Sequence, residues 1–241
     1  MDSGFYAACA GLAARTQALD LAANNLANTS TRGYKAQMPV FQSTLAQAGG
    51  DDLEQAVNNF GVLAGTRLDD RAGALETTGN DFDLALEGNA YFVVKTAAGA
   101  MYTRNGNFEL SSNGQLVTAQ GDAVMGEQGP IQLPAGKVAV ASDGNISVNG
   151  ALAGKLQVVQ FIAGAPLQSV GAGYYTTAAN KVKAADKYTL KQGVLEGSNV
   201  NPMTGAVELI EIQRQFATLQ RVFSAFDSDM NKTAAQDLPR V

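Results

Sequence analysis

The fold is decided by residues 209–230, whose sequence is LIEIQRQFATLQRVFSAFDSDM. Large apolar residues recur there at alternating intervals of three and four, the pattern of a helix that buries one seam against a partner helix. This C-terminal seam consists of Leu209, Ile212, Phe216, Leu219, Phe223, Phe226 and Met230. No glycine or proline interrupts residues 206–237, and charged and amide residues fill the other faces. The stretch therefore predicts a one-sided helix, with no membrane insertion, whose seam needs a cover.

The start of the chain predicts a second helix, over about residues 3–28, with Ser3 as its N-cap. Its large residues are spaced by sevens and are Phe5, Leu12, Leu19 and Leu26. Small residues, Cys9, Thr16 and Ala23, fill the positions between them, and small residues let another helix approach closely. We therefore expect this helix to cover the C-terminal seam.

The middle of the chain alternates apolar and polar residues between turn dipeptides. Phe82, Leu84 and Leu86 alternate with polar or small neighbours, which predicts a strand with one buried face. Turns are predicted at Asn105-Gly106, Asn113-Gly114, Asn149-Gly150 and similar dipeptides. Such turns at intervals of roughly 8–12 residues are typical of an antiparallel, all-β domain.

The predicted fold class is α+β, with a discontinuous terminal helical coiled-coil domain and an inserted antiparallel all-β domain. The predicted boundaries are 1–35 for the N-terminal helix, 36–78 for an extended linker, 79–190 for the β domain and 191–241 for the C-terminal helix. When one row of large residues faces mostly small ones, the free energy gained by burial exceeds the conformational entropy cost of ordering the two helices only slightly. We expect other subunits to complete the burial of the C-terminal seam. The alternative is an intramolecular helical hairpin in a monomeric protein.

The composition argues against most catalytic sites. The 241 residues include no histidine and one cysteine, and 17 Lys and Arg against 22 Asp and Glu give a net charge of −5. Without imidazole there is no Ser-His or Cys-His pair and no His-ligated zinc. The negative charge gives no electrostatic reason to expect nucleic acid. We predict no enzymatic activity, no cofactor, no metal and no small-molecule substrate.

Several stretches resemble the signatures of bacterial flagellar rod and hook proteins. The N-terminal signature is Ala22–Lys35 (AANNLANTSTRGYK), and the C-terminal one is Gly193–Asn201 (GVLEGSNVN), followed by Gln213–Phe216 (QRQF). The middle of the chain is similar over Phe82–Gly88 (FDLALEG), Tyr102–Phe108 (YTRNGNF) and Gly114–Thr118 (GQLVT). The resemblance covers most of the chain, and its terminal motifs are specific.

The resemblance implies a structural subunit of the flagellar axial shaft, in which terminal helices polymerise into an inner tube and the shaft transmits torque for motility. The start Met1-Asp2 with Tyr6 and the compact length are most like a proximal rod subunit, with a distal rod subunit as the alternative. The implied partners are copies of itself, other rod and axial proteins, and the flagellar type III export apparatus. The implied location is the basal body, in the periplasmic space.

Three asparagines of the N-terminal signature are candidate contacts. Asn24, Asn25 and Asn28 lie near the end of the predicted first helix, where side-chain amides can cap carbonyl groups or bind a neighbouring backbone. We expect these asparagines and the large residues of both helices to form subunit contacts. The first eleven residues lack a basic region and a continuous apolar run, so we expect no cleaved signal peptide.

Acidic residues in the sequence suggest two alternative sites, a calcium loop and a carboxylate pair for hydrolysis. Residues 227–231 begin like a calcium loop, but Lys232 stands where glycine is needed and Leu238 where a bidentate glutamate is needed. Three acidic pairs could serve a glycan hydrolase: Asp51-Asp52, Asp69-Asp70, and Asp81 with Asp83. Nothing in the sequence places any pair across a cleft. A secreted adhesin with a coiled-coil stem is the alternative of a different class.

Overall fold

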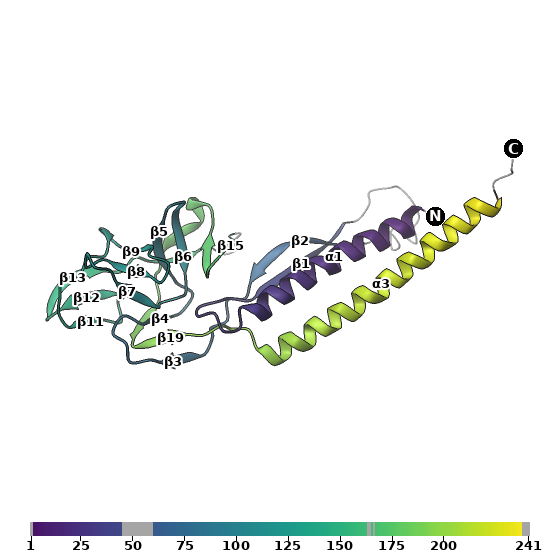
Figure 1. The fold of residues 1–241 in the computed structure, drawn as a ribbon. Helices are drawn as coiled ribbons and strands as arrows, with labels where there is room; N and C mark the ends of the chain where they lie inside the picture. Colours follow the sequence, from purple (N-terminus) through teal and green to yellow (C-terminus); the bar gives the residue numbers. More distant parts are fainter. Residues whose placement is uncertain (1, 45–59, 163–164, 166, 238–241) are drawn as a thin grey trace. The chain divides into compact units, whose positions relative to one another are not determined.

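The computed structural model describes residues 2–44, 60–162, 165 and 167–237 (Figure 1). The chain divides into two compact units. The helical unit consists of Met1–Ala27, Gln37–Arg67 and Asn201–Val241, and the β unit consists of Asn28–Ala36 and Leu68–Val200. No helix among the described residues is both long and apolar enough to cross a membrane.

The helical unit contains two long helices, α1 (Asp2–Ala27) and α3 (Pro202–Asp237). They pack side by side and run in opposite directions (Figure 1). Asn201 caps α3, since its Oδ1 accepts hydrogen bonds from the backbone N–H groups of Met203 (2.9 Å) and Thr204 (3.3 Å). Pro202 follows at the first helical position, where its missing N–H costs nothing. Both helices that the sequence predicts are present.

Residues 36–78, for which the sequence predicts an extended linker, contain a two-stranded sheet. Strands β1 (Gln37–Thr44) and β2 (Phe60–Leu68) pair with each other, and β1 packs against α1. An isolated two-stranded hairpin is marginally stable in water. Packing against α1 therefore supports this hairpin.

The β unit consists of short strands, all of whose described strand-to-strand pairings are antiparallel. The strands and one 3-10 helix are β3 (Leu75–Thr77), β4 (Leu84–Glu87), β5 (Tyr91–Thr96), β6 (Gly99–Thr103), β7 (Phe108–Leu110), β8 (Leu116–Thr118), β9 (Ala123–Gly126), β10 (Gly129–Pro130), β11 (Val138–Val140), β12 (Asn145–Val148), β13 (Ala151–Lys155), β14 (Val158–Phe161), β15 (Gln168–Gly171), β16 (Tyr174–Thr176), η1 (Ala179–Lys181), β17 (Val182–Ala184), β18 (Thr189–Gln192) and β19 (Val194–Glu196). The main sheet has the order β15-β16-β6-β5-β9-β8-β7, and β14 pairs with both β5 and β17. A second sheet has the order β11-β12-β13, and two further pairs are β18-β4 and β19-β3. The predicted antiparallel all-β region is therefore present.

Turn chemistry explains two of the predicted hairpins. Asn149 and Gly150 both have positive φ, 52° and 83°, which suits the tight turn between β12 and β13. Gly114 has a φ of 75° in the turn between β7 and β8. The predicted turn at Asn105-Gly106 joins no hairpin, because β6 pairs with β5 and β16 while β7 pairs with β8. Instead the Gly106 carbonyl accepts a hydrogen bond of 3.0 Å from Leu84 N.

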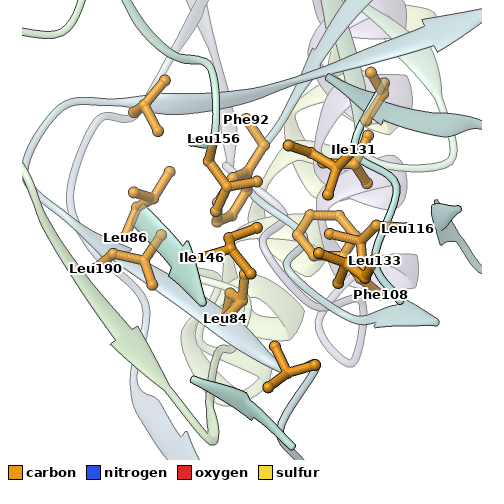
Figure 2. Close-up of a cluster of buried hydrophobic side chains, with 14 of the residues drawn as sticks. Leu84, Leu86, Phe92, Phe108, Leu116, Ile131, Leu133, Ile146, Leu156 and Leu190 are labelled. Atoms are coloured by element: carbon orange, nitrogen blue, oxygen red, sulfur yellow. The ribbon is translucent and has the colours of Figure 1, made fainter. Parts of the chain in front are cut away.

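The core of the β unit lies on both faces of β5. Phe92 and Val94 point into the larger cluster, where the rings of Phe92 and Phe108 meet edge to face with centroids 5.1 Å apart. Figure 2 shows leucines and isoleucines of β4, β8, β12 and other segments converging around these rings. Tyr91 and Val93 belong to a smaller cluster on the other face of the strand.

Candidate functional site

The described residues of the C-terminal seam occupy the half-buried face of α3. Leu209, Ile212, Phe216, Leu219 and Phe223 are partly buried, while their neighbours in residues 207–225 are exposed. Leu219 packs on α1 where the helix has Gly11, because a methyl group on Gly11 would lie 3.8 Å from Leu219 Cδ1. None of these five side chains is fully buried by α1.

The buried row on α1 differs from the predicted one. Ala14, Ala18 and Ala22 are buried and recur at intervals of four, so they lie on one face. The predicted leucines, Leu12, Leu19 and Leu26, are only partly buried. Thr16 and Ala23, which were predicted to fill this seam, are exposed, so that part of the prediction is wrong. The small alanines allow closer helix approach than leucines do, and they therefore take the central row.

An open groove of about 610 Å³ runs between α1 and α3. Leu12 and Phe223 border it, together with Ala217, Gln220, Arg221 and Ser224. Two of the predicted contact residues therefore line a concave surface between the helices.

The signature asparagines make contacts within the chain. Asn25 bonds both backbone groups of Gln37, with Nδ2 donating to the carbonyl (2.8 Å) and Oδ1 accepting from the N–H (2.9 Å), which fixes β1 on α1. Asn28 Oδ1 accepts a hydrogen bond of 3.0 Å from Thr31 Oγ1, and Asn24 is exposed. The side chains of Phe5, Phe226 and Met230 lie outside the described part of the structure. Contacts of all these residues with other subunits stay a prediction.

Three of the sequence motifs meet at a buried charged cluster in the β unit. It consists of Lys35, Arg104 and Glu196, which are exposed by only 1%, 2% and 2%. Lys35 Nζ lies 2.6 Å from Glu196 Oε1, and Arg104 Nη1 lies 3.4 Å from Glu196 Oε2. One carboxylate therefore faces two cations out of contact with water. Burial of such ions is costly unless each is paired and hydrogen-bonded.

Backbone groups supply further hydrogen bonds to this charged cluster, although Arg104 Nε has no hydrogen-bond partner among the described residues. Lys35 Nζ donates to the Arg71 carbonyl at 2.8 Å, and the Gly73 N–H donates to Glu196 Oε1 at 3.0 Å. Arg104 donates to the carbonyls of Leu86, at 2.9 Å, and Gly88. The cluster thereby binds strand β4 and the segment around residues 71–73 to the three motifs.

Asn199 ties the same segments together beside the charged cluster. Its Oδ1 accepts from Ala36 N at 2.8 Å, and its Nδ2 donates to the carbonyls of Asp69 (2.9 Å) and Arg71 (3.0 Å). The Gly33 N–H donates to the Glu196 carbonyl at 2.7 Å. The segment after α1 and the segment before α3 are therefore joined within the β unit.

Two tyrosines pack against the charged cluster. The Tyr175 hydroxyl accepts a hydrogen bond of 3.0 Å from Lys35 N, and Arg104 Cζ lies 4.9 Å from the centre of the Tyr91 ring. Burial lowers the pKa of Lys35, against the opposing effect of Glu196. Burial also raises the pKa of Tyr91 to about 12 and raises that of Tyr175. The surroundings thus disfavour the charged forms of both phenols.

Comparison with known proteins gives matches along most of the chain. Three family profiles match: the D1 domain of the flagellar hook protein FlgE/F/G over residues 85–148, the flagellar basal body rod FlgEFG protein C-terminal region over residues 191–236, and the flagella basal body rod protein over residues 5–35. The chain is 33% identical to the flagellar basal-body rod protein FlgF of Salmonella typhimurium, over 95% of this chain and 96% of the relative. The chain belongs to the flagellar basal-body rod protein family.

Other rod proteins are similar over nearly their whole length. FlgF of Mesorhizobium japonicum is 31% identical, over 97% of this chain and 98% of the relative. FlgG of Bacillus subtilis is 30% identical, over 92% and 94%. These relatives support a structural rod subunit that is FlgF-like and give no support to a secreted adhesin.

The charged cluster of this rod-family chain was not found by sequence reasoning. All three residues stand inside quoted motifs, but charged side chains are usually exposed, and nothing in the local pattern marks these as buried. The available signal is a glycine within two residues of each one: Gly33, Gly106 and Gly197. Gly33 and Gly106 allow backbone segments to meet where a β-carbon would collide, Gly33 with Arg104 and Asn105 and Gly106 with Leu84. At Gly197 a β-carbon would lie 3.4 Å from the Ala74 carbonyl.

Two of the acidic pairs have structural partners in this rod-family chain. Asp69 accepts three hydrogen bonds from the Arg71 guanidinium, which lowers the pKa of that carboxyl. Asp83 accepts from the Asn107 amide at 2.8 Å and from the Asn80 amide at 3.3 Å. Asp51 and Asp52 lie outside the described residues. In the described ranges no group of three or more acidic, His or Cys residues could hold a metal ion.

Alkaline pH is expected to destabilise the β unit through Tyr91. Its pKa is about 12 in the folded chain against an ordinary value of 10, so its contribution is complete below pH 10 and is lost as pH rises toward 12. A tenfold difference in an ionisation constant corresponds to about 1.4 kcal/mol, which makes the full loss about 3 kcal/mol. Urea unfolding of the full chain at pH 9, 10 and 11 measures the decrease in the free energy of unfolding as pH rises.

The Tyr91→Phe variant isolates this effect from the other titrating groups. Lys35 acts in the opposite direction, because its lowered pKa makes stability rise with pH below about 10.5. That rise is common to the wild type and to Tyr91→Phe. The variant should therefore lose less stability between pH 9 and pH 11, and equal losses in both proteins would contradict the assignment to Tyr91.

Proposed function

We propose that this chain is a structural subunit of the flagellar basal-body rod that assembles through its terminal helices. The observation that carries the proposal is the incomplete cover of α3: all five described residues of the C-terminal seam are partly exposed although α1 packs against them. Full burial of a large apolar side chain is worth about 1.5–3 kcal/mol, so each half-buried one has about 1 kcal/mol left to gain. Contact with further helices supplies that burial.

The proposed organisation is a discontinuous helical coiled-coil domain into which the β unit is inserted along the chain, with boundaries near 1–35, 36–78, 79–190 and 191–241. In an axial assembly each subunit binds its neighbours through different, head-to-tail surfaces, and such contacts generate helical growth. The terminal helices form the inner tube, and the β unit forms an outer layer. Partners are copies of the chain and other axial proteins of the flagellum.

The charged cluster supports a role in transmitting torque. Residues 28–36 follow α1 and residues 195–200 precede α3, so both segments connect the β unit to the helical unit along the chain. These two connecting segments are bonded to each other within the β unit. The bonds are the Lys35–Glu196 ion pair, the Gly33–Glu196 backbone hydrogen bond and the hydrogen bond from Ala36 to Asn199. Torque that acts on the two helices would therefore be transmitted to one buried, hydrogen-bonded cluster, and not to two independent flexible linkers.

The position in the rod is proposed as proximal, because relatives named FlgF match at 31% and 33% identity. A distal position is the alternative, since the FlgG relative of Bacillus subtilis matches at 30%. Export is proposed to use the flagellar type III apparatus, without cleavage of a signal peptide, into the periplasmic space. Complementation of strains lacking either rod protein distinguishes the two positions: this chain should restore swimming to the strain lacking FlgF and not to the strain lacking FlgG.

A charge in the C-terminal seam is expected to abolish assembly. Phe216→Asp and Leu219→Asp each place a carboxylate on the face that needs burial, so incorporation into basal bodies and swimming should fall to the level of the deletion strain. Circular dichroism of the purified variants should still show the folded β unit. Gln215→Asp is the matched control on an exposed position of the same helix and should swim normally. Wild-type swimming by either seam variant would refute the role of the seam.

A further inference from the structure

Helix α3 carries a second apolar face, separate from the C-terminal seam. Met203, Val207 and Ile210 are exposed by 78%, 57% and 49%. Their spacing of four and three places them on one side of the helix. At 100° per residue that side lies roughly 150° around the axis from the seam that faces α1. A solvent-exposed row of three large aliphatic residues on one helix indicates a binding surface.

One arginine extends this outer face of α3 along the helix. Arg214 continues the same spacing and is exposed. Its guanidinium forms no salt bridge with another described residue. The outer face of α3 is therefore apolar near the start of the helix and basic further along it.

Helix α1 has a complementary outer face, on the side opposite its buried alanines. It consists of Ala13, Thr16, Asp20, Ala23 and Ala27, which are all exposed and follow intervals of three and four. Four of these residues are small and one is a carboxylate. Asp20 forms no salt bridge with another described residue. Small residues accept large ones from a facing helix, and the carboxylate suits a facing arginine.

An antiparallel alignment brings the two outer faces into register. It places Val207 beside Ala27, Ile210 beside Ala23, and Arg214 beside Asp20. The matched stretches, residues 207–214 and 20–27, span the same number of residues, and the middle pair is offset by one residue, or about 1.5 Å of rise. Within one chain the two outer faces do not meet, because they lie on the sides of α1 and α3 opposite to the buried alanines and the half-buried seam. The match therefore requires two molecules.

We propose that the outer face of α3 binds the outer face of α1 on a second copy of this chain, with Arg214 facing Asp20. The inference rests on the proposed function and specifies which surfaces neighbouring subunits share. Each α1 then lies between its own α3 and that of a neighbour, which makes the contact head-to-tail and repeatable. Within one chain Gly11 faces Leu219, whereas between chains Asp20 faces Arg214. The two registers differ by about four residues, so the neighbour is displaced along the helix axis by about one helical turn.

A charge exchange tests the proposed contact. Arg214→Glu and Asp20→Arg each create a repulsive pair, and each should reduce the chain recovered in isolated basal bodies by about tenfold, the ratio that 1.4 kcal/mol produces. The double variant carries both reversals on every copy and should recover at least half of the wild-type amount. Failure of the double variant to exceed the single variants would overturn the proposal.

A cross-link provides a second measurement that does not depend on the effects of charge. Cys9 is first replaced by serine, and Ala23→Cys and Ile210→Cys are then introduced together. A short bis-maleimide applied to isolated basal bodies should give covalent dimers of this chain, and variants with one cysteine should give none. Absence of the dimer, or a cross-link only to a different polypeptide, would overturn the proposal. If the chain is present in basal bodies and Phe216→Asp removes it, such a result leaves the proposed function intact.

Discussion

Replacing Glu196 with glutamine lowers the free energy of unfolding of the full chain by about 3–5 kcal/mol. Glutamine keeps the size of the side chain but removes the carboxylate that pairs with both Lys35 and Arg104. Two cations are then buried without an anion, and the penalty for breaking a buried ion pair falls in this range. The chain contains no tryptophan, so urea unfolding is followed by circular dichroism or by tyrosine fluorescence.

An exposed ion pair is the matched control for the Glu196 variant. Glu127 lies 2.8 Å from Lys155 Nζ, and its side chain is exposed to solvent. Since exposed pairs contribute about 0–1 kcal/mol, Glu127→Gln should change the free energy of unfolding by no more than about 1 kcal/mol. A double variant, Lys35→Met with Glu196→Gln, should recover part of the loss because it leaves one unpaired cation. Equal effects of Glu127→Gln and Glu196→Gln would contradict the structural role of the charged cluster.

Replacing Gly33 with alanine is expected to destabilise the chain by about 3 kcal/mol or more. Gly33 has a φ of 67°, which costs a non-glycine residue roughly 1–2 kcal/mol. A β-carbon at this position would also collide with the backbone of Arg104 and Asn105. Relief of that collision must move the segment that carries Lys35, or weaken the 2.7 Å hydrogen bond from Gly33 N to the Glu196 carbonyl.

Gly79→Ala separates the two causes of the Gly33 effect. Gly79 has a similar φ of 74°, but no atom lies within 4 Å of the position of a β-carbon. It therefore measures the backbone penalty alone, about 1–2 kcal/mol. Urea unfolding of both variants under one set of conditions gives the comparison. If both alanines cost the same, close approach of Gly33 to the Arg104 segment plays no part in stability.

The helical part of the fold could be predicted because its signal is periodic and local. Phe216, Leu219 and Phe223 recur at helical spacing, and their large side chains mark the inward face of α3 without ambiguity. The buried row of α1 could not be predicted in the same way. Alanines occur around most of that helix, so apolar periodicity pointed to the leucines, while close packing selected Ala14, Ala18 and Ala22.

The charged cluster could not be predicted because its residues meet only in the folded chain. Lys35 and Glu196 are separated by 161 positions, and Arg104 and Glu196 by 92. The Asn105-Gly106 dipeptide misled the prediction for a related reason. Its local chemistry favours a hairpin turn, but the backbone there bonds to Leu84, and the neighbouring strands pair elsewhere.

Isolation of basal bodies from a strain that carries this chain, beside a strain in which its gene is deleted, tests the central claim most directly. Mass spectrometry of the wild-type preparation should find the chain among the rod proteins, and electron microscopy of the deletion strain should find no completed rods. Normal flagella and normal swimming after deletion, with the chain absent from wild-type basal bodies, would contradict the account.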